Sequence, residues 1–337
     1  MDTVVINNLL KEYEQKRINN DLELEVRKNS IYSVCPRLKE IENELNTISI
    51  QTAKSILFSK DVSALDKLEK NIEKLTLEKK ELLKKLDKDE NYLSLNYDCS
   101  ICKDTGYIAS SFGSDTCNCL KQKLFNITYN SSNINNLEKE NFDNFNLDYY
   151  SNTPDLRKYG STTSPKENMD LIKALCVKFV DNFDDPDERN LLFVGNSGTG
   201  KTFLSNCIAK ELLDTGKTVL YQTAPVLFDT IINYRFNKNT GAVNIYDNIL
   251  NVDLLIIDDL GTETTNSMIF SELFNIINSR ILNQNNKITK TIISTNLSLQ
   301  NLLGKYDERI TSRLIGNYTT VKFFGEDIRL LKKGIKL

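Results

Sequence analysis

The segment from Gly195 to Thr202 carries residue types that bind phosphate groups. It reads Gly-Asn-Ser-Gly-Thr-Gly-Lys-Thr and fits the pattern G-x-x-x-x-G-K-[ST]. An apolar run before it predicts a buried strand, and apolar residues at helical spacing after it predict a helix. The N–H groups of such a loop and the positive end of the helix dipole favour a polyanion. The pattern predicts a nucleotide site; a glycine-rich turn without a ligand is the alternative.

Each residue type in this loop has a chemical reason. The glycines let the backbone close around a ligand without a Cβ. We expect Lys201 to reach the outer phosphates and Thr202 to place its hydroxyl on Mg²⁺. The predicted phosphate-binding residues are Gly195, Asn196, Ser197, Gly198, Thr199, Gly200, Lys201 and Thr202.

A pair of acids follows a second buried strand. Residues 254–257 are Leu-Leu-Ile-Ile, and Asp258 and Asp259 come directly after them. In open α/β sheets the ligand binds at the carboxyl ends of the strands. We expect Asp258 to hold Mg²⁺ through water and Asp259 to orient and polarise the attacking water. The alternative is that the acids cap the next turn.

Three further polar residues lie near later strand ends. Asn296 ends an apolar run and can bond a γ-phosphate or the attacking water, or else cap the following helix. Arg309 and Arg313 lie one helical turn apart, so one can fold inward while the other points to a neighbouring subunit's phosphate. Surface salt bridging is the alternative for this pair. Arg329, just past the last strand, is a candidate for the same subunit's phosphates.

Four of the seven cysteines lie close together in the sequence. Cys99-x-x-Cys102 and Cys117-x-Cys119 flank a spacer that contains two glycines. Two short pairs on turns can deliver four thiolates to a tetrahedral Zn²⁺, so a structural zinc site is predicted, with a redox pair or unconnected thiols as alternatives. The other three, Cys35, Cys176 and Cys207, fall in helical patterns and are predicted core residues.

The composition limits what the chain can do. It has 337 residues and no histidine, which excludes Ser-His-Asp triads, Cys-His pairs and zinc sites that use imidazole. A formal net charge of −3 argues against a globally basic nucleic-acid binder, so DNA would need a local patch or a ring of subunits. No stretch reaches about 18 apolar residues and the first residues are not basic, so we expect no membrane span, no secretory signal and a cytoplasmic location.

The patterns divide the chain into four regions. Residues 1–95 show helical spacing and predict a helical hairpin or short coiled coil that serves as a partner-binding arm or packs on its own domain. Residues 96–125 form the predicted zinc module and 126–165 a polar linker. In 166–337, strands at 191–194, 218–222, 254–258, 291–295 and 319–324 alternate with helices, which predicts an α/β fold with a parallel sheet flanked by helices.

These segments together resemble a known family. The phosphate loop, the Asp-Asp pair, Asn296 and Glu308-Arg-Ile-Thr-Ser-Arg-Leu314 are similar to the AAA+ ATPase domain of bacterial replicative helicase loaders of the DnaC/DnaI type, over about residues 165–337. The cysteine segments at 99–108 and 117–122 resemble the amino-terminal zinc region of the DnaI-like branch; because this chain has no histidine, its four cysteines would have to suffice as zinc ligands.

The resemblance implies roles for single residues. Lys201 and Thr202 are then the Walker A pair, and Asp258 and Asp259 are Walker B. Asn296 becomes sensor 1, Arg313 the arginine finger and Arg329 sensor 2. The implied cofactors are ATP, Mg²⁺ and Zn²⁺, and the implied partners are a hexameric replicative helicase, single-stranded DNA and further copies of the chain through the ATPase domain.

Three functions follow from these patterns. The first is an ATP-dependent loader of the replicative helicase onto single-stranded DNA, with Tyr234, Arg235, Phe236 and Lys238 as a candidate stacking and phosphate-contacting segment or a plain solvated helix end. The second is a transposition helper ATPase of the IstB kind, which does not call for the helical arm and the cysteines. The third is a slowly hydrolysing nucleotide switch that acts as a scaffold, because the second Walker B acid is Asp rather than the longer Glu.

Overall fold

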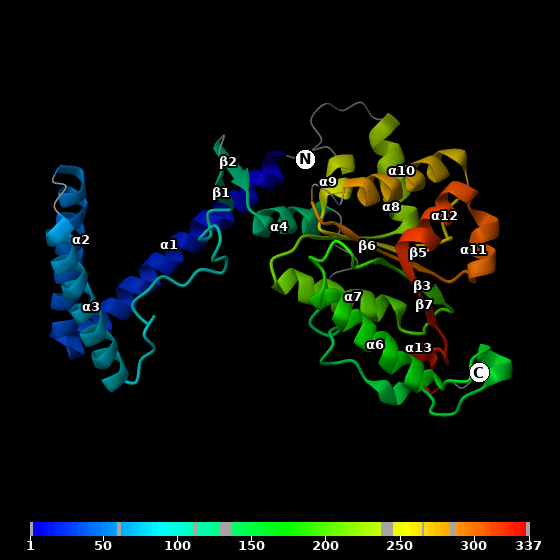
Figure 1. Cartoon of the computed structure of the whole chain (residues 1–337), viewed down its shortest axis with the longest axis horizontal. Helices are drawn as coiled ribbons and strands as arrows, with labels where there is room; N and C mark the ends of the chain where they lie inside the picture. The colour runs from blue at the N-terminus through cyan, green and yellow to red at the C-terminus, as the bar shows by residue number, and fades with distance from the viewer. Residues whose placement is uncertain are drawn as a thin grey trace. The chain divides into compact units, whose positions relative to one another are not determined.

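The computed structural model describes residues 3–58, 62–110, 113–128, 136–236, 245–264, 266–283 and 287–334. For residues 3–6, 49–58, 62–68, 128, 234, 236, 245 and 283 it describes the backbone but not the side chains. The chain forms two compact units, Asn7–Asp115 and Thr116–Leu337, and the first six residues group with the second unit. Figure 1 shows the elements of both units.

The first unit is built on long helices, as the apolar spacing predicts. Helix α1 spans Thr3–Val34, α2 spans Pro36–Phe58 and α3 spans Val62–Lys85. Helices α2 and α3 pack side by side as a hairpin (Figure 1). The predicted turn at residues 59–63 lies mostly outside the described residues.

Apolar and charged contacts hold these helices together. Leu38 and Leu83 are fully buried in a cluster with Ile31 and Leu93. On the seam between α2 and α3, Lys79 donates to a Glu42 carboxylate oxygen at 2.9 Å. The one polar residue in the apolar pattern of α3 therefore has a carboxylate partner.

A small hairpin joins the cysteine pairs. Strand β1 spans Tyr107–Ser110 and β2 spans Gly113–Thr116, and they form a two-stranded sheet. The sequence patterns did not predict these strands, because both are only four residues long and none of their residues is buried. The hairpin occupies the spacer between Cys102 and Cys117.

The second unit contains a five-stranded parallel sheet in the order β4-β5-β6-β3-β7. The strands are β3 (Asn190–Gly195), β4 (Val219–Thr223), β5 (Leu254–Leu260), β6 (Lys290–Thr295) and β7 (Tyr318–Phe323). The predicted parallel sheet flanked by helices is confirmed. In this order β6 is the central strand. It lies between β3, which precedes the phosphate loop, and β5, which carries the two acids, and Asn296 comes directly after it.

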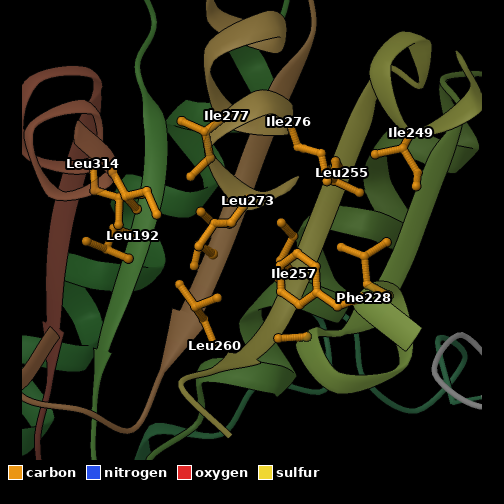
Figure 2. Close-up of a cluster of buried hydrophobic side chains, with 14 of the residues drawn as sticks. Leu192, Phe228, Ile249, Leu255, Ile257, Leu260, Leu273, Ile276, Ile277 and Leu314 are labelled. Carbon is orange, nitrogen blue, oxygen red and sulfur yellow. The ribbon is translucent and has the colours of Figure 1, made fainter. Parts of the chain in front are cut away.

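Helices cover both faces of this sheet (Figure 1). They are α6 (Pro165–Asp181), α7 (Lys201–Asp214), α8 (Ala224–Phe236), α9 (Ile245–Asn251), α10 (Ser267–Asn283), α11 (Leu299–Lys305), α12 (Glu308–Asn317) and the short α13 (Ile328–Leu331), with α5 (Leu156–Tyr159) and the 3₁₀ turn Leu147–Tyr149 before them. Successive strand residues serve opposite faces: Leu192 packs with α10 and α12, whereas Leu191 and Phe193 pack with α6 and α7. Figure 2 shows the first of these two clusters around Leu255, Ile257 and Leu273.

Strands buried on both faces explain the uninterrupted apolar runs in the sequence. Leu254, Leu255, Ile256 and Ile257 are all fully buried.

The start of helix α6 is also set by nearby residues in the sequence. Ser164 begins α6 with a capping box, in which its hydroxyl accepts from the Glu167 N–H at 3.2 Å and its own N–H donates to the Glu167 carboxylate at 2.8 Å.

Helix α4, Asn118–Thr128, packs on the open edge of the sheet formed by β4. The Gln122 carboxamide donates to the Val219 carbonyl at 3.0 Å and accepts from the Val219 N–H at 2.7 Å. One side chain thus supplies both hydrogen bonds that a neighbouring strand would give at this position. Among the helices that the structure describes, none is long and apolar enough to cross a membrane.

Candidate nucleotide-binding site

The loop from Gly195 to Gly200 joins β3 to the start of α7, as the motif requires. Gly198 and Gly200 have φ values of 74° and 105°, in the left-handed region that suits glycine. A Cβ on Gly198 would lie 2.0 Å from the nearest Asp327 carboxylate oxygen. The Thr199 hydroxyl donates to the Asn196 carbonyl at 2.8 Å and closes the loop. Both the turn and the close approach of the chain near α13 therefore need glycine at 198.

Lys201 lies at the centre of the site. Its ammonium donates to the carbonyls of Gly195 at 2.7 Å and Asn196 at 2.8 Å, and to the Asn296 side-chain oxygen at 2.7 Å. Burial lowers the pKa of Lys201 from 10.5 to about 8, against the opposing effect of the Asp259 and Asp258 carboxylates. Three neutral or weakly charged acceptors surround this cation, which a phosphate group would satisfy better.

The two acids lie at the end of β5 and have different surroundings. Asp258 is buried and accepts hydrogen bonds from Thr202 at 3.1 Å and from the Tyr221 hydroxyl at 2.8 Å, and it also accepts from Ser294. Because a carboxylate and a hydroxyl are ligands that Mg²⁺ prefers, Asp258 and Thr202 could hold this cation, directly or through water. Thr202 and Asp258 therefore fit the predicted magnesium site.

Asp259 is held in a backbone conformation that few residues adopt. Its φ is 55°, and its N–H donates to the Ser294 hydroxyl at 3.1 Å. The Asn296 amide nitrogen donates to the Asp259 carboxylate at 3.1 Å. Burial and the neighbouring Asp258 charge raise the pKa of Asp259. Asn296 thus links Lys201 to Asp259. With a phosphate bound at Lys201, a water molecule could be oriented between Asp259 and that phosphate.

Tyr221 and Ser294 were missed by the sequence analysis. Both lie inside apolar strand runs, on β4 and β6, and both donate to Asp258. The available signal was weak: each is a hydroxyl residue within a strand that neighbours β5, close to its carboxyl end.

Next to the loop lies a cavity of about 220 Å³. Much of its wall comes from residues 140–150, which the sequence analysis assigned to a linker. Phe145 stacks on Tyr150 with ring centroids 6.2 Å apart, and the Tyr150 hydroxyl donates to the Thr199 carbonyl at 3.2 Å. The lining residues are Glu140, Asn144, Phe145, Asn146, Tyr149, Tyr150, Ser197, Gly198, Gly200, Lys201, Thr202, Phe203, Asp259, Asn296, Ile328, Arg329 and Lys332. Aromatic rings beside a phosphate loop suit a nucleobase. Arg329 lines the same cavity, which is where a residue that contacts the phosphates of its own subunit would lie.

The two arginines of α12 differ in what they contact. Arg309 pairs with Asp307 at 3.0 Å and lies over the Phe274 ring at 5.2 Å. Arg313 is exposed, and within the described part of the chain no ion pair is found for it. Arg313 does not line the cavity, whereas Lys201, Asp259, Asn296 and Arg329 do. Both arginines are thus exposed, and they differ in that Arg309 is paired within its own chain.

The four clustered cysteines come together in space. Their sulfur atoms all lie within 4.8 Å of one another. Four thiolates about 2.3 Å from one Zn²⁺ would lie about 3.8 Å apart, so Cys99, Cys102, Cys117 and Cys119 fit a tetrahedral site. Asp104 is buried and its carboxylate accepts from the N–H of Cys99 at 2.9 Å, which shapes the first turn. Cys176 and Cys207 are buried in the core, as predicted, and Cys35 is half-buried.

The candidate DNA-contacting segment is described only in part. Arg235 pairs with the buried carboxylate of Glu272 at 2.7 Å and lies over the Tyr246 ring at 5.7 Å. The side chains of Tyr234 and Phe236, and the whole of Lys238, lie outside the described residues. A DNA contact by this segment stays a prediction.

The sequence was compared with protein families, curated proteins and solved structures. Residues 151–333 match the family described as IstB-like ATP binding protein. The chain is 29% identical over 153 residues to the replicative helicase loader DnaC of Escherichia coli K12, covering 45% of this chain and 60% of that protein. It is 29% identical over 167 residues to a putative insertion sequence ATP-binding protein of Sinorhizobium fredii, covering 47% of this chain and 64% of that protein. A solved DnaC helicase loader structure aligns with a TM-score of 0.41 and 23% identity, covering 53% of this chain and 96% of that chain. The chain thus spans less than two thirds of the length of these curated relatives.

Proposed function

Because the chain belongs to the IstB-like ATP-binding protein family, we propose that it binds and slowly hydrolyses ATP in order to load a replicative DNA helicase onto single-stranded DNA. The observation that carries the ATP part is the grouping of Lys201, Asp258, Asp259 and Asn296 at adjacent strand ends beside an aromatic-walled cavity. The helicase loader of Escherichia coli among the relatives supports the loading part.

The proposed chemistry assigns a task to each residue. Lys201 and the amides of residues 195–202 bind the phosphates, and Thr202 and Asp258 hold Mg²⁺. The metal ion supplies charge neutralisation at the phosphate oxygens. Asp259, fixed by Asn296, orients a water that attacks the γ-phosphorus; the bond from this phosphorus to the bridging oxygen breaks, and ADP, phosphate and a proton are released. Arg329 contacts the phosphates of its own subunit.

Arg313 is proposed to act between copies of the chain. Both arginines are exposed, but Arg309 already pairs with Asp307, so we assign to Arg313 the contact with a neighbouring copy's γ-phosphate. We expect Arg313→Ala to leave the Kd for ATP unchanged and to lower hydrolysis in the assembled state by roughly 10³-fold or more. Arg309→Ala is the matched control and should change hydrolysis far less. Loss of ATP binding in Arg313→Ala would place this residue in its own subunit's site and contradict the proposal.

The helical and cysteine-containing part before the ATPase domain is proposed to recognise the helicase. We propose residues 1–95 as the partner-binding arm and residues 96–125 as a module stabilised by one Zn²⁺ on Cys99, Cys102, Cys117 and Cys119. The family's insertion-sequence relative gives the second candidate function, a transposition helper. This alternative gives no task to the cysteine cluster, so we rank it lower.

Loading can be tested directly with the full chain. The host's replicative helicase is mixed with circular single-stranded DNA, which has no end to thread, and bound helicase is measured by cosedimentation. The unaltered chain with ATP should raise the bound fraction, and the Lys201→Ala variant should not. No gain with the unaltered chain, or recovery of a transposase instead of a helicase on affinity capture, would overturn the loader proposal.

A further inference from the structure

We propose that Glu263 is a positioning residue that joins the acid-bearing end of β5 to helix α12 and so sets the place of Arg313. The inference rests on the proposed function, because it takes Arg313 to act on a neighbouring copy's nucleotide. Glu263 lies outside the cavity and touches none of the predicted ligands of phosphate or metal.

The Glu263 carboxylate is buried and has partners on two sides. Its side chain is 1% exposed. One oxygen accepts from the Gly261 N–H at 2.7 Å, and the other accepts from the Tyr306 hydroxyl at 2.5 Å. The Lys305 ammonium lies 3.7 Å from the second oxygen and donates to the Gly261 carbonyl at 2.5 Å. A charged carboxylate with such partners is a strong and directional link.

One end of this link is the nucleotide site. Residues 261–263 follow the end of β5, and the Thr262 hydroxyl donates to the Asp259 carbonyl at 2.8 Å. Asp259 in turn receives the Asn296 hydrogen bond described above. A change in the position of Asp259 is therefore passed to Gly261 and to the Glu263 carboxylate through hydrogen bonds and a short stretch of backbone.

The other end of the link is the start of α12. Tyr306 is buried and packs edge-on against Phe270, with ring centroids 5.4 Å apart. The next residue, Asp307, is the N-cap of α12 and accepts from the Ile310 N–H at 3.0 Å. At the far end of the helix, Arg189 donates to the Ile315 carbonyl at 3.3 Å. Helix α12 is thus held at its start by the strand that carries the acids and at its end by the residue before β3.

The strength of the link depends on the negative charge of the carboxylate. The Gly261 N–H and the Tyr306 O–H are both donors to it. In Glu263→Gln the side chain keeps its size but loses its negative charge. Its oxygen can still accept from Gly261 and its NH₂ group can donate to the Tyr306 hydroxyl oxygen, but both are then weaker neutral hydrogen bonds, the Tyr306 hydroxyl has to turn its proton away, and the Lys305 ammonium loses its carboxylate partner. Since a misplacement of about 1 Å can cost roughly 100-fold in rate, a small shift of α12 is enough to impair Arg313.

A complementation experiment separates this role from a role in the chain's own site. Full-length Lys201→Ala chains keep Arg313 but should not hold ATP, and Arg313→Ala chains hold ATP but lack the arginine. Mixed under the conditions in which the unaltered chain hydrolyses ATP, the pair should be active only where a Lys201→Ala copy donates Arg313 to an Arg313→Ala copy. Glu263→Gln is then added to one chain of the pair at a time.

We expect Glu263→Gln to lower ATP turnover about tenfold or more when it is in the arginine-donating chain, and less than about twofold when it is in the ATP-holding chain. Tyr306→Phe in the donor should act in the same direction, and the exposed Glu308→Gln on the same helix is the matched control. The Kd for ATP and the thermal midpoint of each variant show that it is folded.

Each of the other results overturns the inference. A loss seen only in the ATP-holding chain would mean that Glu263 acts on its own Asp259, and an equal loss in both chains would mean a general structural role. No loss in either chain would mean that the link does not position Arg313. Absence of complementation by the parental pair would instead refute transfer of the arginine between copies, and this inference with it.

Discussion

Arg280 on α10 provides the sharpest test of how the sheet is held together. The side chain is 1% exposed and is the largest of the fully buried side chains. Its guanidinium donates to the carbonyls of Ile249 at 2.8 Å, Val252 at 3.0 Å and Lys290 at 2.7 Å, and to the Thr291 hydroxyl at 2.9 Å. One side chain therefore joins the end of α9 to the starts of β5 and β6.

The expected cost of Arg280→Met follows from these contacts. Methionine fills much of the volume but has no donor, so several buried carbonyls lose their partner, each at about 1–3 kcal/mol. Part of this is offset, because the variant no longer buries a cation, and burial itself lowers the pKa of Arg280 from 12.5 to about 10. We expect a net loss of about 3–5 kcal/mol in the free energy of unfolding of the second unit.

Hydrogen exchange measured by mass spectrometry across a urea series can follow the second unit alone, which matters because the chain has no tryptophan and the first unit is helical too. With a urea m-value of about 2–3 kcal/mol/M, the midpoint for peptides of β5 and β6 should fall by about 1–2.5 M. The exposed Arg157→Met is the matched control and should move it by less than about 0.3 M. A midpoint in Arg280→Met as high as in the control would show that desolvation cancels the hydrogen bonds, and would refute this reasoning.

Three other perturbations give defined outcomes. Gly198→Ala forces a left-handed residue and a contact with Asp327, so ATP should bind roughly fivefold to thirtyfold more weakly by isothermal titration calorimetry, while Gly304→Ala, with open space around it, should bind ATP normally. Cys99→Ser should reduce zinc from one per chain to a trace by elemental analysis, and equal zinc in Cys99→Ser and Cys35→Ser would remove the zinc proposal. Burial raises the pKa of Asp253, but hydrogen bonds from Lys287 and Thr218 outweigh it, and the net pKa is lowered. A carboxylate whose pKa is lowered in the folded chain stabilises it above the unfolded pKa of 3.8, and this stability is lost as pH falls through the folded pKa. Asp253→Asn should therefore make the unfolding free energy depend less steeply on pH below about pH 4. A plot of unfolding free energy against pH with the same slope as that of the unaltered chain would contradict this.

The parts of the fold that were predictable are those where a short segment determines its own structure. Each predicted strand of the second unit is present, because a strand buried on both faces must be apolar along its length. The phosphate loop was predictable since its glycines and Lys201 act through the local backbone. The neighbouring positions of Asp258 and Asn296 followed from the parallel sheet, in which strand ends share one edge.

What was not predictable depends on contacts between distant segments. Residues 140–150 were assigned to a linker because their polar composition shows no periodicity, yet Tyr150 reaches Thr199 and Phe145 helps to line the cavity. Tyr221 and Ser294 were taken as ordinary strand residues, because nothing local shows that both meet Asp258. Glu263 carries no motif at all, and its place between Gly261 and Tyr306 exists only in the folded chain.

The contacts of Lys201 suggest how the chain could distinguish nucleotide states. Its ammonium bonds Asn296, and Asn296 bonds Asp259, so the cation and the acid share one amide. In the proposed function, a γ-phosphate would compete for the Lys201 ammonium and free the Asn296 oxygen, which would change what the amide can offer to Asp259. Since Asp259 is joined to the segment that ends at Glu263 by the Thr262 hydrogen bond and a short stretch of backbone, the same event would reach the start of α12. The arginine offered to a neighbouring copy would then depend on the nucleotide in its own chain, which is the coupling that an ordered assembly of ATPase subunits requires.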